Sequence, residues 1–154
     1  MVEMMPLSDE HWMEVCLEEA RAAAEDGEVP VGAVVVHRDA IVARGRNASI
    51  RLNDPSAHAE IIAMRAAGAA LGNYRLPEVE VFVSVEPCLM CVGALLHARV
   101  RRVVYGCADP RAGALGSIAD FSNDPRLNHR LIVKAGVCSA AAGQLLQDFL
   151  RARR

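Results

Sequence analysis

Two short segments constrain this fold most, because together they carry one histidine, one glutamate and two cysteines at close spacing. They are His58-Ala59-Glu60 and Pro87-Cys88-Leu89-Met90-Cys91. Two thiolates and one imidazole are a donor set that selects zinc. Cys88 and Cys91, three residues apart at the start of a predicted helix, lie on one face of it. The positive N-terminus of that helix favours the thiolate forms that bind metal. The chain must therefore bring two segments that are about 30 residues apart to one point.

The number of protein ligands indicates a catalytic metal site. Structural zinc sites normally close with four protein ligands, and the sequence has no second C-x-x-C pair and no nearby pair of His residues. Three protein ligands leave a fourth position open to water, whose pKa zinc lowers to about 7. Glu60 lies in the same first helical turn and can carry a proton from water to a substrate. We predict His58, Cys88 and Cys91 as ligands and Glu60 as the catalytic residue.

Strand and helix patterns alternate along the chain. Short β-branched or alternating runs predict strands over 31–36, 41–43, 79–85, 103–105 and 131–133. Helical spacing and end signals predict helices over 9–25, from near His58 to about Ala70, directly after Pro87, and over 140–152. Because no repeat or long linker interrupts this order, we expect one domain over residues 1–154. Strands alternating with helices indicate an α/β sheet covered on both faces.

Particular residues predict where these elements begin and end. Ser8 is a plausible N-cap of the first helix, which Gly27 ends. His37-Arg38-Asp39-Ala40 reads as the turn of a hairpin. Pro87 suits the first turn of its helix because it has no N–H to lose. The last helix should place Leu145, Leu146 and Phe149 on its inner face.

Composition indicates a globular chain without a membrane or export signal. Hydrophobic residues make up 53% and charged residues 23% of the 154 residues. No apolar run reaches the roughly 20 residues that a membrane span needs, and the N-terminus does not resemble a signal peptide. We expect a cytoplasmic protein, in which thiols stay reduced. Cys16, Cys107 and Cys138 then read as small buried hydrophobic residues.

Charge is distributed unevenly along the chain. Residues 99–154 hold nine Arg and one Lys against four Asp, whereas residues 1–98 hold seven Arg against fifteen acidic residues. A basic C-terminal third suits a polyanionic partner, because the planar Arg fork binds two phosphate oxygens. A solvated surface in an Arg-rich protein explains the same pattern, so charge alone leaves both interpretations open.

The combination of H-x-E and P-C-x-x-C is the signature of zinc nucleobase deaminases. Over roughly residues 9–154 the chain resembles the bacterial tRNA-specific adenosine deaminases of the cytidine deaminase-like superfamily. The resemblance rests on several stretches beside the two motifs, namely Glu28-Val29-Pro30-Val31-Gly32-Ala33-Val34, Asp54-Pro55-Ser56-Ala57, Asn73-Tyr74-Arg75-Leu76, Gly113-Ala114-Leu115-Gly116-Ser117, Asn128-His129-Arg130 and Asp148-Phe149-Leu150-Arg151.

This resemblance implies a fold, a cofactor and a reaction. The fold is a three-layer α/β/α cytidine deaminase-like fold with a five-stranded mixed sheet. The protein is expected to be a homodimer with one Zn²⁺ per subunit. The reaction is hydrolytic deamination of the wobble adenosine of a tRNA anticodon loop to inosine. A base flipped from a splayed loop is accessible to such a site.

The resemblance also implies substrate-binding residues. Asn47 is expected to hydrogen-bond the flipped base, Val29 and Pro30 to lie near the pocket wall, and Ala59 to offer a backbone contact. We hypothesise that Asp109 accepts a hydrogen bond from a ribose 2′-OH and so favours RNA over DNA. Ordinary turn roles explain Asn47 and Asp109 as well. The C-terminal residues Arg151, Arg153 and Arg154 are expected to contact tRNA phosphates.

Two other functions remain open at this point. A deaminase of a free base or nucleotide, of the cytosine, guanine or deoxycytidylate type, would use the same four residues. A catalytically silent zinc-binding interaction module would use the same ligands. The stretches typical of the tRNA family and the basic C-terminal third favour RNA over a free base. Replacing Glu60 by Gln separates an enzyme from a silent module.

Overall fold

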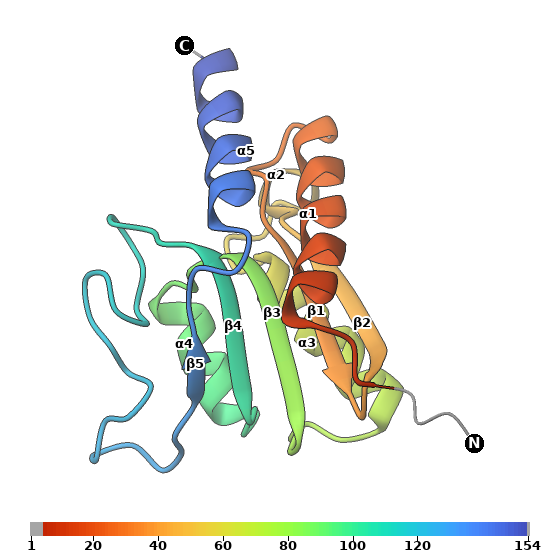
Figure 1. The fold of residues 1–154 in the computed structure, drawn as a ribbon, viewed down its shortest axis with the longest axis vertical. Helices are drawn as coiled ribbons and strands as arrows, with labels where there is room; N and C mark the ends of the chain where they lie inside the picture. The colour runs from red at the N-terminus through yellow and green to blue at the C-terminus, as the bar shows by residue number, and fades with distance from the viewer. Residues whose placement is uncertain (1–4, 154) are drawn as a thin grey trace.

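A five-stranded mixed sheet forms the centre of the computed structural model, which describes residues 5–153. Its order is β2-β1-β3-β4-β5 (Figure 1). The strands are β1 (Gly32–His37), β2 (Ala40–Arg46), β3 (Val79–Val85), β4 (Arg102–Cys107) and β5 (Ile132–Lys134). β1 pairs antiparallel with β2 and β3, whereas β3, β4 and β5 are parallel. Valine dominates the central strands, as expected for a sheet buried on both faces.

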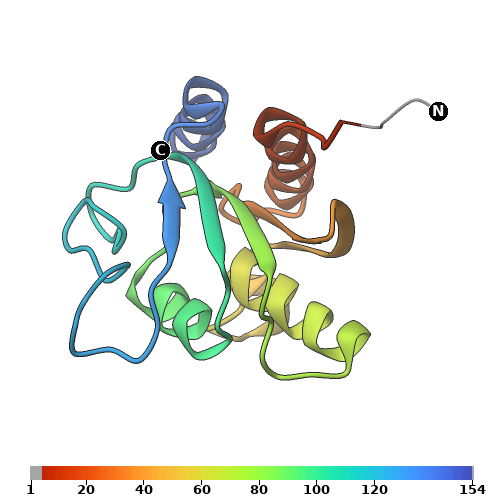
Figure 2. The same ribbon diagram turned by 60° about the horizontal axis from the view of Figure 1, so that its bottom comes forward.

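Helices cover both faces of the sheet, which confirms the predicted α/β/α layers. α1 (Asp9–Glu25) and α5 (Ser139–Ala152) lie on one face, and α3 (Ala59–Leu71) and α4 (Leu89–His97) lie on the other (Figure 2). Successive residues along each strand point alternately to the two helix layers. Val34, Phe82 and Val104 pack with Trp12 and Met13 of α1. Their neighbours along the strands pack with α3 and α4, and these include Val35, Val81, Val83 and Val103.

The first two strands form the hairpin that the sequence predicts. Arg38 and Asp39 occupy its turn with φ of 50° and 63°, the left-handed conformation that two-residue hairpin turns require. β2 continues to Arg46, three residues beyond the predicted end at Ala43. This extension matters because it delivers Asn47 directly to the functional site described below.

Helix ends follow the sequence signals, with one correction. The Ser8 hydroxyl accepts a hydrogen bond from the His11 N–H at 3.1 Å, and Gly27 follows α1 with φ of 81°. Pro87 was predicted to lie in the first turn of its helix, and this is wrong. Cys88 takes the N-cap position and the helix begins at Leu89, so Pro87 precedes the cap.

The chain differs from prediction in two further elements. A four-residue helix, α2 (Ser49–Leu52), was not predicted, because it is too short for a periodic pattern. The predicted inner face of α5 is only half-buried at Leu145, Leu146 and Phe149, and Ala142 is its buried contact. Figure 1 shows why: the C-terminal turns of α5 extend past the end of the sheet.

The three cysteines outside the metal motif lie in apolar surroundings. Cys16 and Cys107 are buried, as predicted, and Cys138 is half-buried against the core. All five cysteines are free thiols. Among residues 5–153, no helix combines the length and apolar character that a membrane span requires.

Candidate active site

Two helix N-termini bring the predicted metal ligands together. His58 is the N-cap of α3, Cys88 is the N-cap of α4, and Cys91 lies in the first turn of α4. His58 Nδ1 lies 3.6 Å from Cys88 Sγ and 3.6 Å from Cys91 Sγ. Ligand atoms around a tetrahedral zinc ion, one nitrogen and one sulfur, are about 3.6 Å apart. The donor set and its spacing therefore fit zinc.

The charges of the three ligands also suit a dication. Hydrogen bonds from Cys91 and His58 lower the pKa of the Cys88 thiol to about 3. The same contact with Cys88 raises the pKa of His58. The pKa of Cys91 is raised, because it hydrogen-bonds to Cys88 and is buried beside Glu60. A metal ion replaces the protons that these three groups otherwise share.

Glu60 is buried beside this cluster. Its side chain is only 3% exposed, and burial raises the pKa of its carboxyl group. It lies in the first turn of α3 and lines the same pocket as His58 and Cys88. Among the described residues, the group with metal-ligand spacing consists of His58, Cys88 and Cys91 without Glu60. The carboxyl group is therefore placed to carry protons rather than to bind the ion.

A pocket of about 530 Å³ opens over the cluster. Its walls come from the segment before β1, the end of β2, the end of β3, the loop after β4, and α5. The lining residues are Val29, Val31, Asn47, His58, Glu60, Val85, Glu86, Cys88, Ala108, Asp109, Pro110, Arg111, Ala112, Leu146 and Leu150. This volume lies within the usual range for small-ligand sites.

The pocket contains three of the five predicted substrate-binding residues. Val29, Asn47 and Asp109 line it, whereas Pro30 and Ala59 are buried and do not. The backbone N–H of Ala59 donates to Asn47 Oδ1 at 2.8 Å. Asn47 thus satisfies one of the free N–H groups at the start of α3, that of the residue between His58 and Glu60 in the chain.

The Asp109 side chain forms an ordinary turn with the backbone that follows it. Its Oδ1 accepts hydrogen bonds from the N–H groups of Arg111 at 3.0 Å and Ala112 at 3.3 Å. These bonds shape the loop after β4, which supplies five consecutive pocket residues, 108–112.

The C-terminal arginines differ in their surroundings. Arg151 is exposed on α5. Arg153 donates to the Gly27 carbonyl, and its guanidinium lies 4.3 Å above the Phe149 ring. Arg154 lies outside the described residues.

Two buried carboxylates beside the pocket were not predicted. Glu28 is 2% exposed and accepts from the N–H groups of Ile50 at 3.0 Å and Arg51 at 2.8 Å. Glu86 is 3% exposed and accepts from the loop after β4. Both precede prolines in segments that carry the family resemblance, but nothing in a single sequence distinguishes a buried glutamate from a surface one.

Comparison with known proteins places the chain among zinc deaminases. Residues 6–107 match the family described as the cytidine and deoxycytidylate deaminase zinc-binding region. The tRNA-specific adenosine deaminase of Agrobacterium fabrum is 43% identical over 94% of this chain and 95% of that relative. The chain belongs to the tRNA-specific adenosine deaminase family. It is a zinc-type deaminase, with one zinc site built from His58, Cys88 and Cys91.

Solved structures agree with this family. A structure from a study of A-to-I editing by tRNA deaminases at the wobble position has a TM-score of 0.86 and 43% identity, over 88% of this chain and 99% of that one. A guanine deaminase from Nitrosomonas europaea has a TM-score of 0.78 at 29% identity, over 96% of this chain and 87% of that one. The fold is thus shared with a free-base deaminase, but the sequence is closer to the tRNA-editing enzymes.

Proposed function

We propose that this protein deaminates the wobble adenosine of a tRNA anticodon loop to inosine. The observation that carries the proposal is the His58-Cys88-Cys91 cluster beside buried Glu60, in a chain 43% identical to a tRNA-specific adenosine deaminase over nearly its whole length. The reaction consumes water and releases ammonia. Its net change is the replacement of the C6 amino group of adenine by oxygen.

Glu60 moves the protons in this proposal. Zinc, when bound by the three ligands, acts as a Lewis acid and makes water nucleophilic at neutral pH. Glu60 takes one proton as water attacks C6 and delivers it to N1 of the base. It then takes the proton of the new C6 hydroxyl and passes it to the departing amine, so that ammonia leaves as the C6–N6 bond breaks and the C6=O bond forms. A carboxyl group whose pKa is raised by burial suits both directions of transfer near neutral pH.

Asn47 orients the base. Its Oδ1 is held by the Ala59 N–H, which turns the amide so that its NH₂ group can donate to an acceptor on the adenine ring. Val29, which is 43% exposed, supplies an apolar wall of the pocket. Pro30 is buried next to Val29 in the chain and does not line the pocket, and Ala59 acts through its hydrogen bond to Asn47. Because Asp109 lines the pocket, we retain the proposed contact from its carboxylate to a ribose 2′-OH.

A direct assay distinguishes this function from deamination of a free base. Ammonia release is compared for an anticodon stem-loop with adenosine at the wobble position, free guanine and free cytidine. The proposal predicts rapid release from the stem-loop and negligible release from the other two. Faster release from guanine or cytidine would replace the proposal with a free-base deaminase.

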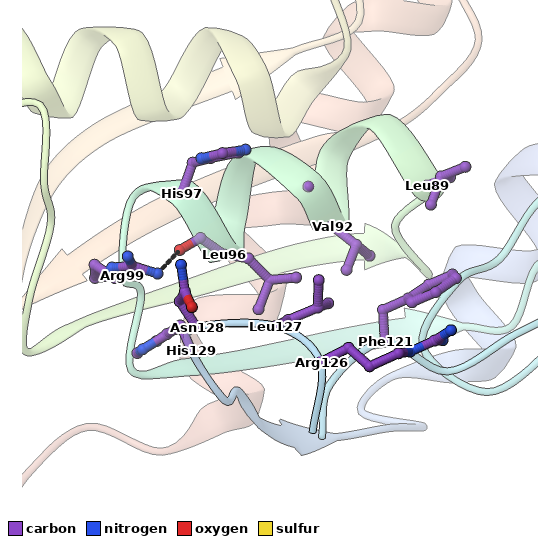
Figure 3. Close-up of a pocket in the computed structure, with 11 residues that line it drawn as sticks. Leu89, Val92, Leu96, His97, Arg99, Phe121, Arg126, Leu127, Asn128 and His129 are labelled. Atoms are coloured by element: carbon purple, nitrogen blue, oxygen red, sulfur yellow. Dashed lines mark hydrogen bonds between the residues drawn. The ribbon is translucent and has the colours of Figure 1, made fainter. Parts of the chain in front are cut away.

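We also propose a homodimer, in line with the family resemblance. Apolar side chains gather on the outer side of α4 and the loop that faces it, including Leu89, which is 60% exposed, and Ile118, which is also 60% exposed. A pocket of about 340 Å³ lies beside them, where Val92 and Leu96 of α4 face Phe121 and Leu127 (Figure 3). Sedimentation equilibrium tests this assembly, and a monomer at micromolar concentration would contradict it.

The remaining proposals concern organisation and location. Residues 1–154 are proposed to form one deaminase domain, since its sheet takes strands from residue 32 to residue 134. The cytoplasm is proposed as its location. Five cysteines without a disulfide suit a reducing compartment, and the proposed tRNA substrate is in line with this location. Fractionation of cells that express the chain tests this location.

A further inference from the structure

Glu86 joins the metal site to the loop that forms one wall of the pocket. It directly follows β3, one residue before Pro87 and two residues before the ligand Cys88. Glu86 Oε1 accepts from the Asp109 N–H at 3.1 Å and from the Ser117 hydroxyl. Glu86 Oε2 accepts from the N–H groups of Leu115 and Ser117, each at 3.1 Å. One buried carboxylate therefore holds both ends of the loop formed by residues 108–117.

The Glu86 carboxylate packs closely against Gly113. Gly113 lies against the carboxylate so closely that a Cβ at this position would be 2.2 Å from Glu86 Cδ. The same loop forms a β-bridge with Cys88 through Gly113, and the Ala114 N–H donates to the Pro87 carbonyl at 2.9 Å. The loop is thus hydrogen-bonded to Glu86-Pro87-Cys88, a segment that includes the metal ligand Cys88.

The loop supplies the pocket wall from Ala108 to Ala112. Residues 108–112 belong to no helix or strand, and they lie between β4 and the β-bridge at Gly113. We infer that Glu86 is a positioning residue for the deamination reaction. It holds the pocket wall at Asp109 at a set position relative to the metal ligand Cys88. The substrate base and its ribose are thereby positioned next to zinc and Glu60. This inference rests on the proposed function.

Substitution by Gln tests the role with little change in shape. A Gln side chain can keep one acceptor oxygen but turns an NH₂ group toward donors on the other side. If its oxygen retains the Leu115 and Ser117 N–H groups, the NH₂ group faces the Asp109 N–H. The Asp109 end of the loop is then released. Glu80→Gln is the matched control, since Glu80 is a carboxylate within β3 that pairs with Arg102 and does not line the pocket.

Three measurements on each variant decide the role. For Glu86→Gln we expect a KM for the anticodon stem-loop raised about tenfold, the loss expected for a charged hydrogen bond. We expect kcat within about threefold of the parent protein and an unchanged zinc content. Amide hydrogen exchange at Asp109, Leu115 and Ser117 should become faster, whereas Glu80→Gln leaves all of these values unchanged.

Gly113→Ala provides a second route to the same result. Its Cβ displaces the carboxylate without altering Glu86, so it should raise KM and accelerate amide exchange in the same loop. If Glu86→Gln does not fold, Gly113→Ala and Ser117→Ala decide the question. Loss of zinc with the loop amides still protected would overturn the inference, because Glu86 would then support Cys88 alone. An unchanged KM with unchanged exchange would overturn it as well.

These readouts separate the inference from the proposed function. If the parent protein fails to deaminate the stem-loop, the proposed function is wrong. The exchange experiment then still shows whether Glu86 holds the loop. If the parent protein deaminates the stem-loop and Glu86→Gln has the same KM, only the inference fails.

Discussion

The side-chain oxygen of Asn47 accepts the backbone N–H of Ala59 at 2.8 Å, between the zinc ligand His58 and the buried Glu60. This hydrogen bond gives Asn47 two separable roles. Its oxygen accepts from the start of α3, and its NH₂ group is proposed to donate to the base in the pocket that Asn47 lines. The two roles can be tested apart, because aspartate keeps the oxygen and loses the donor.

Asn47→Asp should retain stability and lose activity. We expect a melting temperature close to that of the parent protein, since the helix cap remains. We expect kcat/KM on the stem-loop to fall about 10- to 100-fold, because an acceptor on the base loses its partner. Asn47→Ala should lose both, with about 1 kcal/mol of stability from the missing cap. Equal activity of the Asp variant and the parent would show that the NH₂ group does not touch the substrate.

Asp109→Asn should alter the choice between RNA and DNA. The substitution keeps the Oδ1 acceptor that shapes the turn through Arg111 and Ala112. It removes the charge that is proposed to accept from a ribose 2′-OH. We expect the ratio of RNA to DNA deamination to fall several-fold, measured on stem-loops of the same sequence. An unchanged ratio would leave Asp109 with its turn role alone.

Arg151 and Arg153 should differ in their effect on RNA binding. Arg151 is exposed, whereas Arg153 is engaged with the Gly27 carbonyl and the Phe149 ring. Loss of a phosphate contact flattens the dependence of log Kd on log salt concentration by about one unit. We expect this change for Arg151→Ala, and a smaller one for Arg153→Ala with some loss of stability. Titrations at several salt concentrations measure both, and equal slopes for parent and Arg151→Ala would exclude the contact.

Asp9 should make stability depend on pH in the acid range. Arg102 donates to it at 2.7 Å and Lys134 at 2.8 Å, and these bonds lower the Asp9 pKa from 3.8 to about 2. Because the folded-state pKa is the lower one, the stabilisation is complete above pH 3.8 and is lost as the pH falls toward 2. Solvent reaches this network, so we expect about 1 kcal/mol.

Unfolding of Asp9→Asn across pH measures this contribution. The variant should be less stable than the parent at pH 7, and the difference should shrink as the pH falls through 2. Glu10→Gln, an exposed carboxylate in the same helical turn, is the control and should show little difference at any pH. A constant difference for Asp9→Asn down to pH 2 would contradict the lowered pKa of Asp9.

The sequence was sufficient to predict the metal site because its ligands follow local rules. His58, Cys88 and Cys91 occupy caps or first turns of helices, and their positions depend on short-range signals that a single chain contains. The alternation of strands and helices, with valine runs between helix caps, predicted the layered fold for the same reason.

The positions that the sequence did not reveal depend on contacts between distant segments. Glu28 accepts hydrogen bonds from α2 and Glu86 accepts them from the loop after β4, and these partners lie about 20 to 30 residues away in the chain. The position of Pro87 before the cap depends on Cys88 taking the N-cap itself. The half-exposed face of α5 follows from the length of the sheet, since the helix continues past its end.

The most direct test measures zinc content and inosine formation together in Glu60→Gln and Cys88→Ser. The account predicts one zinc per chain in Glu60→Gln, with turnover of the stem-loop reduced by a factor of about 100 to 10,000, the usual contribution of general acid–base catalysis. Cys88→Ser should lose zinc and activity together. Near-parental turnover in Glu60→Gln, or loss of its zinc, would contradict the assignment of Glu60 as the proton carrier beside a three-ligand metal site.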